Sequence, residues 1–161
     1  MKKKKISFEL TIFDGLSELS DADRALMDQA VAARKNAYAP YSNFQVGAAV
    51  LMENGEVVIG SNQENASYPS GLCAERVAVF QAGARYPNIV IKTVAISAAS
   101  KNYKVEKPAA PCGNCRQAIS EYETKQKSPI RLLLMGDTGK VFQCDSLADI
   151  MPLTFDSSFL R

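Results

Sequence analysis

The chain has 161 residues, of which 47% are hydrophobic and 22% are charged, and its formal net charge is +2. This length suits one compact domain, and the composition argues against a disordered chain. Because the net charge is small and four lysines are gathered at residues 2–5, we predict no basic face for nucleic acid. No segment approaches the ~20 apolar residues that a membrane helix needs, so we expect no membrane partner.

The lysine run at residues 2–5 does not begin a signal peptide. The residues that follow it are interrupted by two acids, Glu9 and Asp14, and never form an uncharged apolar stretch. We therefore expect the protein in the cytoplasm. A reducing compartment keeps cysteines as thiols, so the four cysteines are expected to be available to a metal ion rather than paired in disulfides.

Helical and extended segments alternate along the chain. Ser20 and the acids after it predict a helix N-terminus, and Asn54-Gly55 predicts a tight turn between two strands. Helices are predicted at residues 20–37, 73–84 and 112–123, and strands at residues 8–13, 44–52, 56–61, 88–97, 130–135 and 141–145. This order is typical of an α/β domain built in layers around a mixed sheet.

The chain contains no histidine, so a zinc site would have to be built from cysteine thiolates. Cys73 lies two residues before Glu75, and Cys112 and Cys115 are separated by about one helical turn. A structural zinc is closed by four protein ligands, whereas a catalytic zinc has three and leaves one position to water or substrate. Three cysteines with a carboxylate beside one of them fit the catalytic kind, in which Glu75 can carry protons to and from the activated water.

Both cysteine motifs occur where a loop is predicted to enter a helix, and a helix N-terminus favours the thiolate form. Cys73 and Glu75 would point away from each other within a regular helix, so we predict that Cys73 lies at the irregular start of its helix. Three thiolates outweigh the charge of one zinc ion. We expect Arg76, in preference to Arg116, to offset this charge by hydrogen bonding to a ligand sulfur.

The segments CAER at residues 73–76 and PCGNCRQ at residues 111–117 resemble the small all-cysteine cytidine deaminases. Residues 37–49, 62–68 and 151–155 also resemble segments of this family, in the family's order. The resemblance implies a catalytic domain at residues 20–161, preceded by an N-terminal extension at residues 1–19. It also implies a three-layer fold, with a mixed five-stranded sheet and helices on both faces.

The resemblance implies the hydrolytic deamination of cytidine and deoxycytidine to uridine and deoxyuridine, with release of ammonia, as a step of pyrimidine salvage. The implied cofactor is one zinc ion per chain, held by Cys73, Cys112 and Cys115. The zinc would activate a water, and Glu75 would act as the proton shuttle.

The resemblance further implies six residues that bind the nucleoside: Phe44, Asn62, Glu64, Tyr68, Ala74 and Phe155. Asn62 and Glu64 would bind the ribose hydroxyls, and Phe44 and Tyr68 would line the nucleoside pocket. The backbone of Ala74 would read the base edge. Phe155 would come from a neighbouring subunit, because this family is typically a homotetramer with shared sites.

Other readings stay open on the residues alone. Cys144 could close the site as a fourth sulfur and make it structural, although a buried small hydrophobic role suits its strand-like setting better. Cys112 and Cys115 could form a redox dithiol, but such a pair has no need of Cys73 or Glu75. Within the family, a deaminase of a cytosine-bearing antibiotic nucleoside would use the same zinc site, whereas a polynucleotide deaminase would need a basic, aromatic-lined channel.

Overall fold

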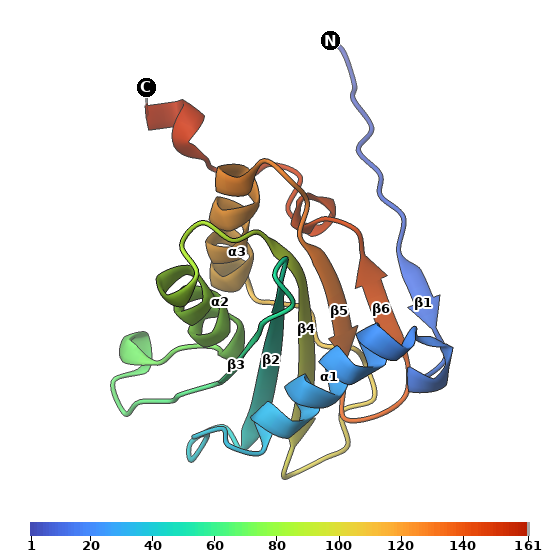
Figure 1. Ribbon diagram of the computed structural model, residues 1–161, viewed down its shortest axis with the longest axis vertical. Coiled ribbons are helices and arrows are strands. Elements are labelled where there is room, and N and C mark those ends of the chain that lie inside the picture. The colour runs from blue at the N-terminus through green and yellow to red at the C-terminus, as the bar shows by residue number, and fades with distance from the viewer. Residues whose placement is uncertain (161) are drawn as a thin grey trace.

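The computed structural model describes residues 1–160 (Figure 1). Its strands form one sheet in the order β1-β6-β5-β4-β2-β3, in which β4 and β5 are parallel and all other neighbours are antiparallel. The strands are β1 (Thr11–Phe13), β2 (Phe44–Met52), β3 (Val57–Ser61), β4 (Ile91–Ser100), β5 (Arg131–Met135) and β6 (Val141–Cys144). The α-helices are α1 (Asp21–Arg34), α2 (Ala74–Arg85) and α3 (Gly113–Gln126). In the described part of the chain, no helix has the length and apolar character needed to cross a membrane.

The sheet has six strands, where the resemblance implies five. The additional strand is β1, which pairs antiparallel with β6 so that Ile12 lies opposite Phe142. It belongs to the segment that the sequence predicts as an edge strand. The count differs because β1 lies in the N-terminal extension, outside the part of the chain that resembles the family.

The three layers are confirmed, with α1 on one face of the sheet and α2 and α3 on the other (Figure 1). Alternate side chains of the strands divide the interior into two cores. In β2, Ala48 and Val50 belong to the core under α2 and α3, whereas Ala49 belongs to the core under α1. The α/β class and the mixed sheet are therefore as predicted.

Local signals in the sequence place two boundaries correctly. Ser20 is the N-cap of α1, and its hydroxyl accepts a hydrogen bond from the Asp23 N–H at 3.1 Å. Gly55, in the turn between β2 and β3, has a φ of 86°, which glycine adopts without a steric penalty. The helix start and the hairpin are both confirmed.

Gly60 in β3 allows the first turn of α2 to lie directly against the sheet. A Cβ atom at this position would lie 2.6 Å from the Ala74 carbonyl oxygen and 2.6 Å from the Ala78 nitrogen. No side chain fits between the two backbones. This close approach fixes the start of α2, and with it Cys73 and Glu75, relative to the strands.

Candidate metal centre and active site

Three cysteine sulfurs meet where α2 and α3 begin. The Sγ atoms of Cys73, Cys112 and Cys115 all lie within 4.8 Å of one another, and those of Cys73 and Cys112 are 3.8 Å apart. A tetrahedral zinc ion with Zn–S bonds of ~2.3 Å holds its sulfurs roughly 3.8 Å apart. The spacing of the sulfurs therefore fits one zinc ion.

The helix N-termini bring these sulfurs together. Cys73 is the N-cap of α2, Cys112 is the N-cap of α3, and Cys115 lies fully buried in the first turn of α3. The backbone of Cys73 is extended, with φ −70° and ψ 153°. The prediction that Cys73 lies at the irregular start of its helix is confirmed, and neither N-cap sulfur is engaged in capping its own helix.

The sulfur cluster favours loss of a first proton from Cys73. A hydrogen bond from the Cys115 thiol lowers the pKa of Cys73 to about 5, against the opposing effect of burial, and Cys112 and Arg76 lower it further. The same interaction, together with burial, raises the pKa of Cys115. One thiolate is thus ready to bind a cation, and the other sulfurs are of the kind that lose their protons when the metal binds.

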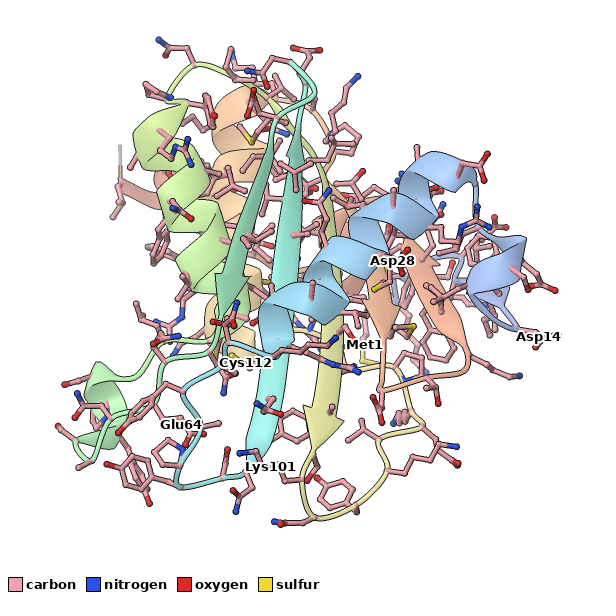
Figure 2. The ribbon with its side chains drawn as sticks, turned by 60° about the horizontal axis from the view of Figure 1, so that its bottom comes forward. Met1, Asp14, Asp28, Glu64, Lys101 and Cys112 are labelled. Atoms are coloured by element: carbon pink, nitrogen blue, oxygen red, sulfur yellow. The ribbon has the colours of Figure 1, made fainter. Side chains whose placement is uncertain are left out.

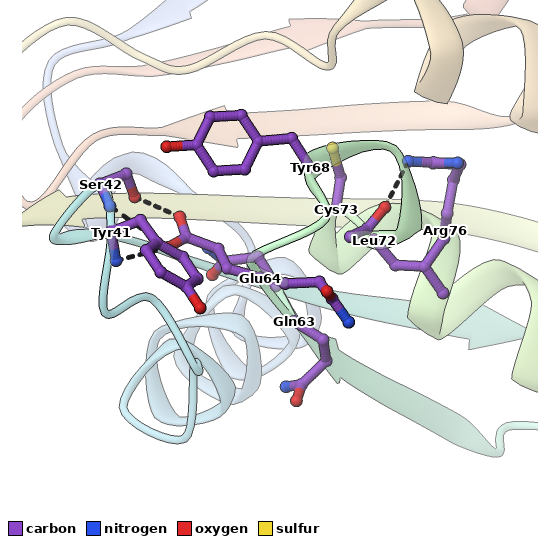
Figure 3. Close-up of a pocket in the computed structure, with 11 residues that line it drawn as sticks. Tyr41, Ser42, Gln63, Glu64, Tyr68, Leu72, Cys73 and Arg76 are labelled. Atoms are coloured by element: carbon purple, nitrogen blue, oxygen red, sulfur yellow. Dashed lines mark hydrogen bonds between the residues drawn. The ribbon is translucent and has the colours of Figure 1, made fainter.

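Arg76 lies beside the sulfurs of Cys73 and Cys115. Its Nη2 donates to the Gly71 carbonyl oxygen at 3.4 Å, while its buried Nε has no hydrogen-bond partner among the described residues (Figure 3). An unpaired buried N–H is costly, and a thiolate of the neighbouring cysteines would supply the acceptor that it lacks. The position of Arg76 supports the role predicted for it.

Arg116 makes different contacts. Its Nε donates to the Pro111 carbonyl oxygen at 2.9 Å, and its Nη1 donates to the Ile150 carbonyl oxygen at 2.8 Å. These bonds tie the loop before Cys112 to the segment that follows β6. Arg116 therefore braces the backbone near the metal centre.

Glu75 is buried in the first turn of α2, with 5% of its surface exposed. Burial is the main cause that raises the pKa of this carboxyl, and the nearby charge of Cys73 raises it further. A carboxyl group whose pKa is raised holds a proton more readily than an exposed one, which suits a group that must both accept and release a proton during turnover. The environment of Glu75 thus suits proton transfer beside the sulfur cluster.

A cleft of about 460 Å³ is bordered by Cys73 and Arg76 (Figure 3). It is lined by residues before β2 and between β3 and α2, namely Tyr41, Ser42, Asn62, Gln63, Glu64, Asn65, Tyr68, Gly71, Leu72, Cys73 and Arg76. Figure 2 is turned so that this end of the molecule comes forward, with Glu64 and Cys112 labelled. Three of the predicted nucleoside-binding residues, Asn62, Glu64 and Tyr68, line the cleft. The other three, Phe44, Ala74 and Phe155, do not.

Asn62 is buried, and both ends of its amide bind the backbone of β2. Its Oδ1 accepts a hydrogen bond from the Val46 N–H at 2.8 Å, and its Nδ2 donates to the Phe44 carbonyl oxygen at 3.0 Å. A carboxamide nitrogen has two N–H groups. One donor of Asn62 therefore remains for a ligand, held in place by β2.

Glu64 accepts three hydrogen bonds from the turn before β2. The donors are the Tyr41 N–H at 3.0 Å, the Ser42 N–H at 3.2 Å and the Ser42 hydroxyl (Figure 3). Burial acts to raise the pKa of Glu64, but these bonds lower it overall below its ordinary value of 4.5. A carboxylate accepts about four hydrogen bonds, so one acceptor position remains. Together, Asn62 and Glu64 offer one donor and one acceptor, the complement of a hydroxyl group.

Ser42 is the residue at this site that the sequence prediction misses. Its hydroxyl donates to Glu64 and accepts a hydrogen bond from the Phe44 N–H at 3.0 Å. The local signal is a serine that follows a proline and a tyrosine and comes two residues before a strand, a typical setting for a side-chain turn. The link to Glu64 spans 22 residues and leaves no such signal.

Tyr41 and Tyr68 both line the cleft. Tyr68 is 76% exposed, and its ring centroid lies 6.0 Å from that of Tyr41.

Phe155 is 56% exposed and stacks on Phe159 with ring centroids 5.4 Å apart. Its carbonyl oxygen accepts a hydrogen bond from Gln117 on α3. Phe155 therefore does not line the cleft of its own chain.

Cys144 does not join the group of three sulfurs found in the described residues. It is 1% exposed at the end of β6, where it lies opposite Leu132 in the core. Burial raises the pKa of its thiol. These properties favour a packing role for Cys144 and a metal centre with an open fourth position.

A family model of the cytidine and deoxycytidylate deaminase zinc-binding region matches residues 20–128. The chain belongs to this family. The match confirms the resemblance and the zinc cofactor, and the group of three cysteines fits one ion per chain.

Relatives of known sequence and structure agree with the family assignment. A cytidine deaminase of Halalkalibacterium halodurans is 47% identical over 96 residues, which cover 60% of this chain and 68% of the relative. A cytidine deaminase of Mycobacterium tuberculosis is 37% identical over 115 residues, covering 70% and 82% of the two chains. The crystal structure of cytidine deaminase from Burkholderia pseudomallei is similar with a TM-score of 0.71 and 38% identity, over 85% of this chain and 100% of that chain. The fold is confirmed as that of a cytidine deaminase.

Proposed function

We propose that this chain hydrolyses cytidine and deoxycytidine to uridine and deoxyuridine and releases ammonia. The proposal depends above all on one observation, the three cysteine sulfurs that meet at two helix N-termini next to a buried glutamate. The relatives named as cytidine deaminases support the choice of substrate. Cys73, Cys112 and Cys115 are the proposed zinc ligands, and Glu75 is the proposed catalytic residue.

A zinc ion bound by these ligands supplies a water that is acidic enough to react at neutral pH. Glu75 takes one proton from the attacking water and delivers it to the ring nitrogen as the new C–O bond forms. It then takes the remaining proton of that hydroxyl and transfers it to the amino group, so that the C–N bond breaks, the carbonyl forms and ammonia leaves. Its raised pKa makes both directions of transfer accessible. Arg76 donates toward the ligand sulfurs and offsets part of their negative charge, which keeps the bound water acidic.

The ribose lies at Asn62 and Glu64 in this proposal, because a hydroxyl can donate to the free position of Glu64 and accept from the free N–H of Asn62. Tyr68 packs at the sugar side of the cleft, and the backbone of Ala74 faces the base. Phe44 supports this region through its backbone bonds to Asn62 and Ser42.

We infer a homotetramer in which Phe155 of one subunit contacts the pyrimidine in the site of a neighbour. The exposed Phe155 and its absence from the cleft of its own chain support this arrangement. We also infer a role in pyrimidine salvage in the cytoplasm, where a reducing environment maintains the thiolates that zinc requires.

Turnover measured by ultraviolet absorbance tests the proposed function directly. Protein of known zinc content is offered cytidine, deoxycytidine and a cytosine-bearing antibiotic nucleoside. We expect conversion of the first two substrates, because Asn62 and Glu64 are complementary to an ordinary ribose hydroxyl. Turnover of the antibiotic alone would identify the other branch of the family, and zinc-loaded protein that deaminates none of the three would contradict the proposal.

Ser42→Ala is expected to raise KM for cytidine about tenfold with little change in kcat, since a hydrogen bond to a charged group contributes ~1.5–3 kcal/mol. The lost bond raises the pKa of Glu64 toward its ordinary value. Nucleoside binding depends on ionised Glu64, so as the pH falls the variant loses affinity at a higher pH than the parent does. KM and kcat measured across the acidic range check this expectation.

Ser42→Thr is the matched control, because it keeps the hydroxyl and should restore both KM and its pH profile. A KM for Ser42→Ala that equals the parent value at every pH would remove Ser42 from substrate positioning.

A further inference from the structure

The first ten residues, here called the N-terminal arm, lie outside the compact body of the protein. They are exposed and form neither helix nor strand, and Figure 1 shows them leaving β1 and running past the sheet. The family model begins at residue 20, and 85% of this chain covers the whole Burkholderia pseudomallei enzyme. The family match therefore leaves the arm without an assigned part in the deaminase fold.

A row of large apolar side chains follows the arm into β1. Ile6, Phe8, Leu10 and Ile12 are 53%, 49%, 38% and 51% exposed. Figure 1 draws the arm as an extended trace, and every second side chain of an extended segment lies on the same side, so we expect these four to form one apolar stripe. Phe13 packs into the core under α1, which directs Ile12 and the stripe to the opposite face of the sheet. A contiguous exposed stripe of this kind indicates a binding surface.

The backbone at this position is also available for pairing. β1 is the edge strand of the sheet and has β6 on one side only. Folded proteins usually protect such an edge with a short strand or with charges on it, and β1 itself has only three residues. Here the apolar stripe continues from β1 back to Ile6, so the free edge and the apolar side chains are presented together.

The charged residues along this segment indicate which kind of partner it would bind. Four lysines occupy residues 2–5, whereas Asp14, Glu18 and Asp21 follow β1. The side chains of Asp14 and Asp21 are 78% and 94% exposed, although each already has an ion-pair partner in its own chain, Lys140 for Asp14 at 3.5 Å and Arg24 for Asp21 at 2.6 Å. Exposed pairs of this kind are weak and leave the acids open to further cations. Two such segments paired antiparallel place the lysines of each beside the acids of the other, but a parallel pair would place lysines against lysines. The segment is thus complementary to itself in one orientation.

We propose that the N-terminal arm pairs with the arm of a second copy of this chain, antiparallel about a two-fold axis near Leu10. On this axis, Phe8 of one copy lies opposite Ile12 of the other, and the two sheets join through their β1 edges. An anionic membrane would also attract the lysines and Phe8. A membrane of this kind would repel Asp14, Glu18 and Asp21 and would leave the backbone edge of β1 unpaired. A second copy of the chain therefore explains more of the observations.

Site-specific photo-crosslinking tests this pairing in the full-length protein. A photoreactive benzoyl-phenylalanine is placed at Phe8, and unlabelled chains are mixed with isotope-labelled chains to identify links between copies. We expect links between chains that map to residues 10–14. The same group at Tyr103, which is 63% exposed on another loop, is the control and should give no such links. Links confined to one chain, links between the lysine ends of two arms, or no links would overturn the proposal.

The same crosslinking is repeated with vesicles of phosphatidylcholine and phosphatidylserine in equal parts, which tests the membrane as the alternative partner. Links from Phe8 to lipid, with flotation of the protein and no links between chains, would assign the arm to a membrane. Links between chains that persist unchanged with vesicles present support the paired arms.

Charge variants give an independent readout. Changing all four lysines at residues 2–5 to Glu should lower the yield of links between chains about tenfold. Adding Asp14→Lys and Glu18→Lys in the same chain should restore it, because the charge pattern is then reversed and again complementary. Failure of this restoration in protein with unchanged circular dichroism contradicts the antiparallel pairing. Deamination is not used as a readout, so the result does not depend on the proposed function.

Discussion

Replacing Glu75 by Gln is expected to lower kcat for cytidine at least ~100-fold, the usual contribution of a positioned proton carrier. Glutamine keeps the size of the buried side chain but can neither accept nor deliver the proton. Because Glu75 is not a proposed ligand, the variant should retain zinc at the level of the parent protein. Steady-state turnover and metal content, measured on the same sample, check both parts of the expectation.

Glu121→Gln is the matched control for this substitution. Glu121 lies exposed on α3, so its replacement removes a carboxylate without touching the sulfur cluster or the cleft. The control should have the kcat of the parent. If Glu75→Gln retained full activity with zinc bound, Glu75 would have no part in the chemistry.

Cys112→Ser is expected to weaken zinc binding by more than ~100-fold, since even changes in groups that only support a ligand cost 10–100-fold. Three sulfurs at one point are the minimum for an ion that keeps one open position, and loss of one leaves too few donors. Activity should fall with the bound zinc. Metal analysis after dialysis, together with turnover, measures both losses.

Cys144→Ser separates this expectation from a general effect of removing a cysteine. Cys144 lies in the core away from the cluster, so this variant should keep its zinc and its turnover. Loss of zinc from Cys144→Ser would show that a fourth sulfur closes the site and that the site is structural.

The two halves of the metal centre could be predicted from the sequence because each half is a local motif at a helix start. Cys73 precedes Glu75 by two residues, and only an irregular helix start can direct both toward one point, which is the conformation that the structure shows. Cys112 and Cys115 share a helical turn. The absence of histidine removes the main competing ligand and leaves only sulfur.

The residue at which β4 ends could not be predicted from the local sequence pattern. The sequence predicts this strand at residues 88–97, but it runs from Ile91 to Ser100. The last three residues are small and have little strand preference of their own. They are extended because Ala98, Ala99 and Ser100 pair with the first residues of β2. Such pairing depends on residues that are distant in the chain.

The substrate side of the site shows the same limit. Glu64 receives its donors from Ser42 and Tyr41, more than twenty residues away, and neither residue has a pattern that names its partner. The bond from Asn62 to Phe44 likewise joins the residue after β3 to the start of β2. The resemblance points to Asn62 and Glu64, but only the fold reveals which of their hydrogen-bonding positions remain free.

X-ray absorption at the zinc K-edge of the full-length protein counts the atoms bound to the metal and so shows whether its fourth position is open. We expect three sulfur ligands at ~2.3 Å and one oxygen or nitrogen ligand, the signature of an open catalytic site. A shell of four sulfurs, or zinc bound without sulfur, would contradict this expectation.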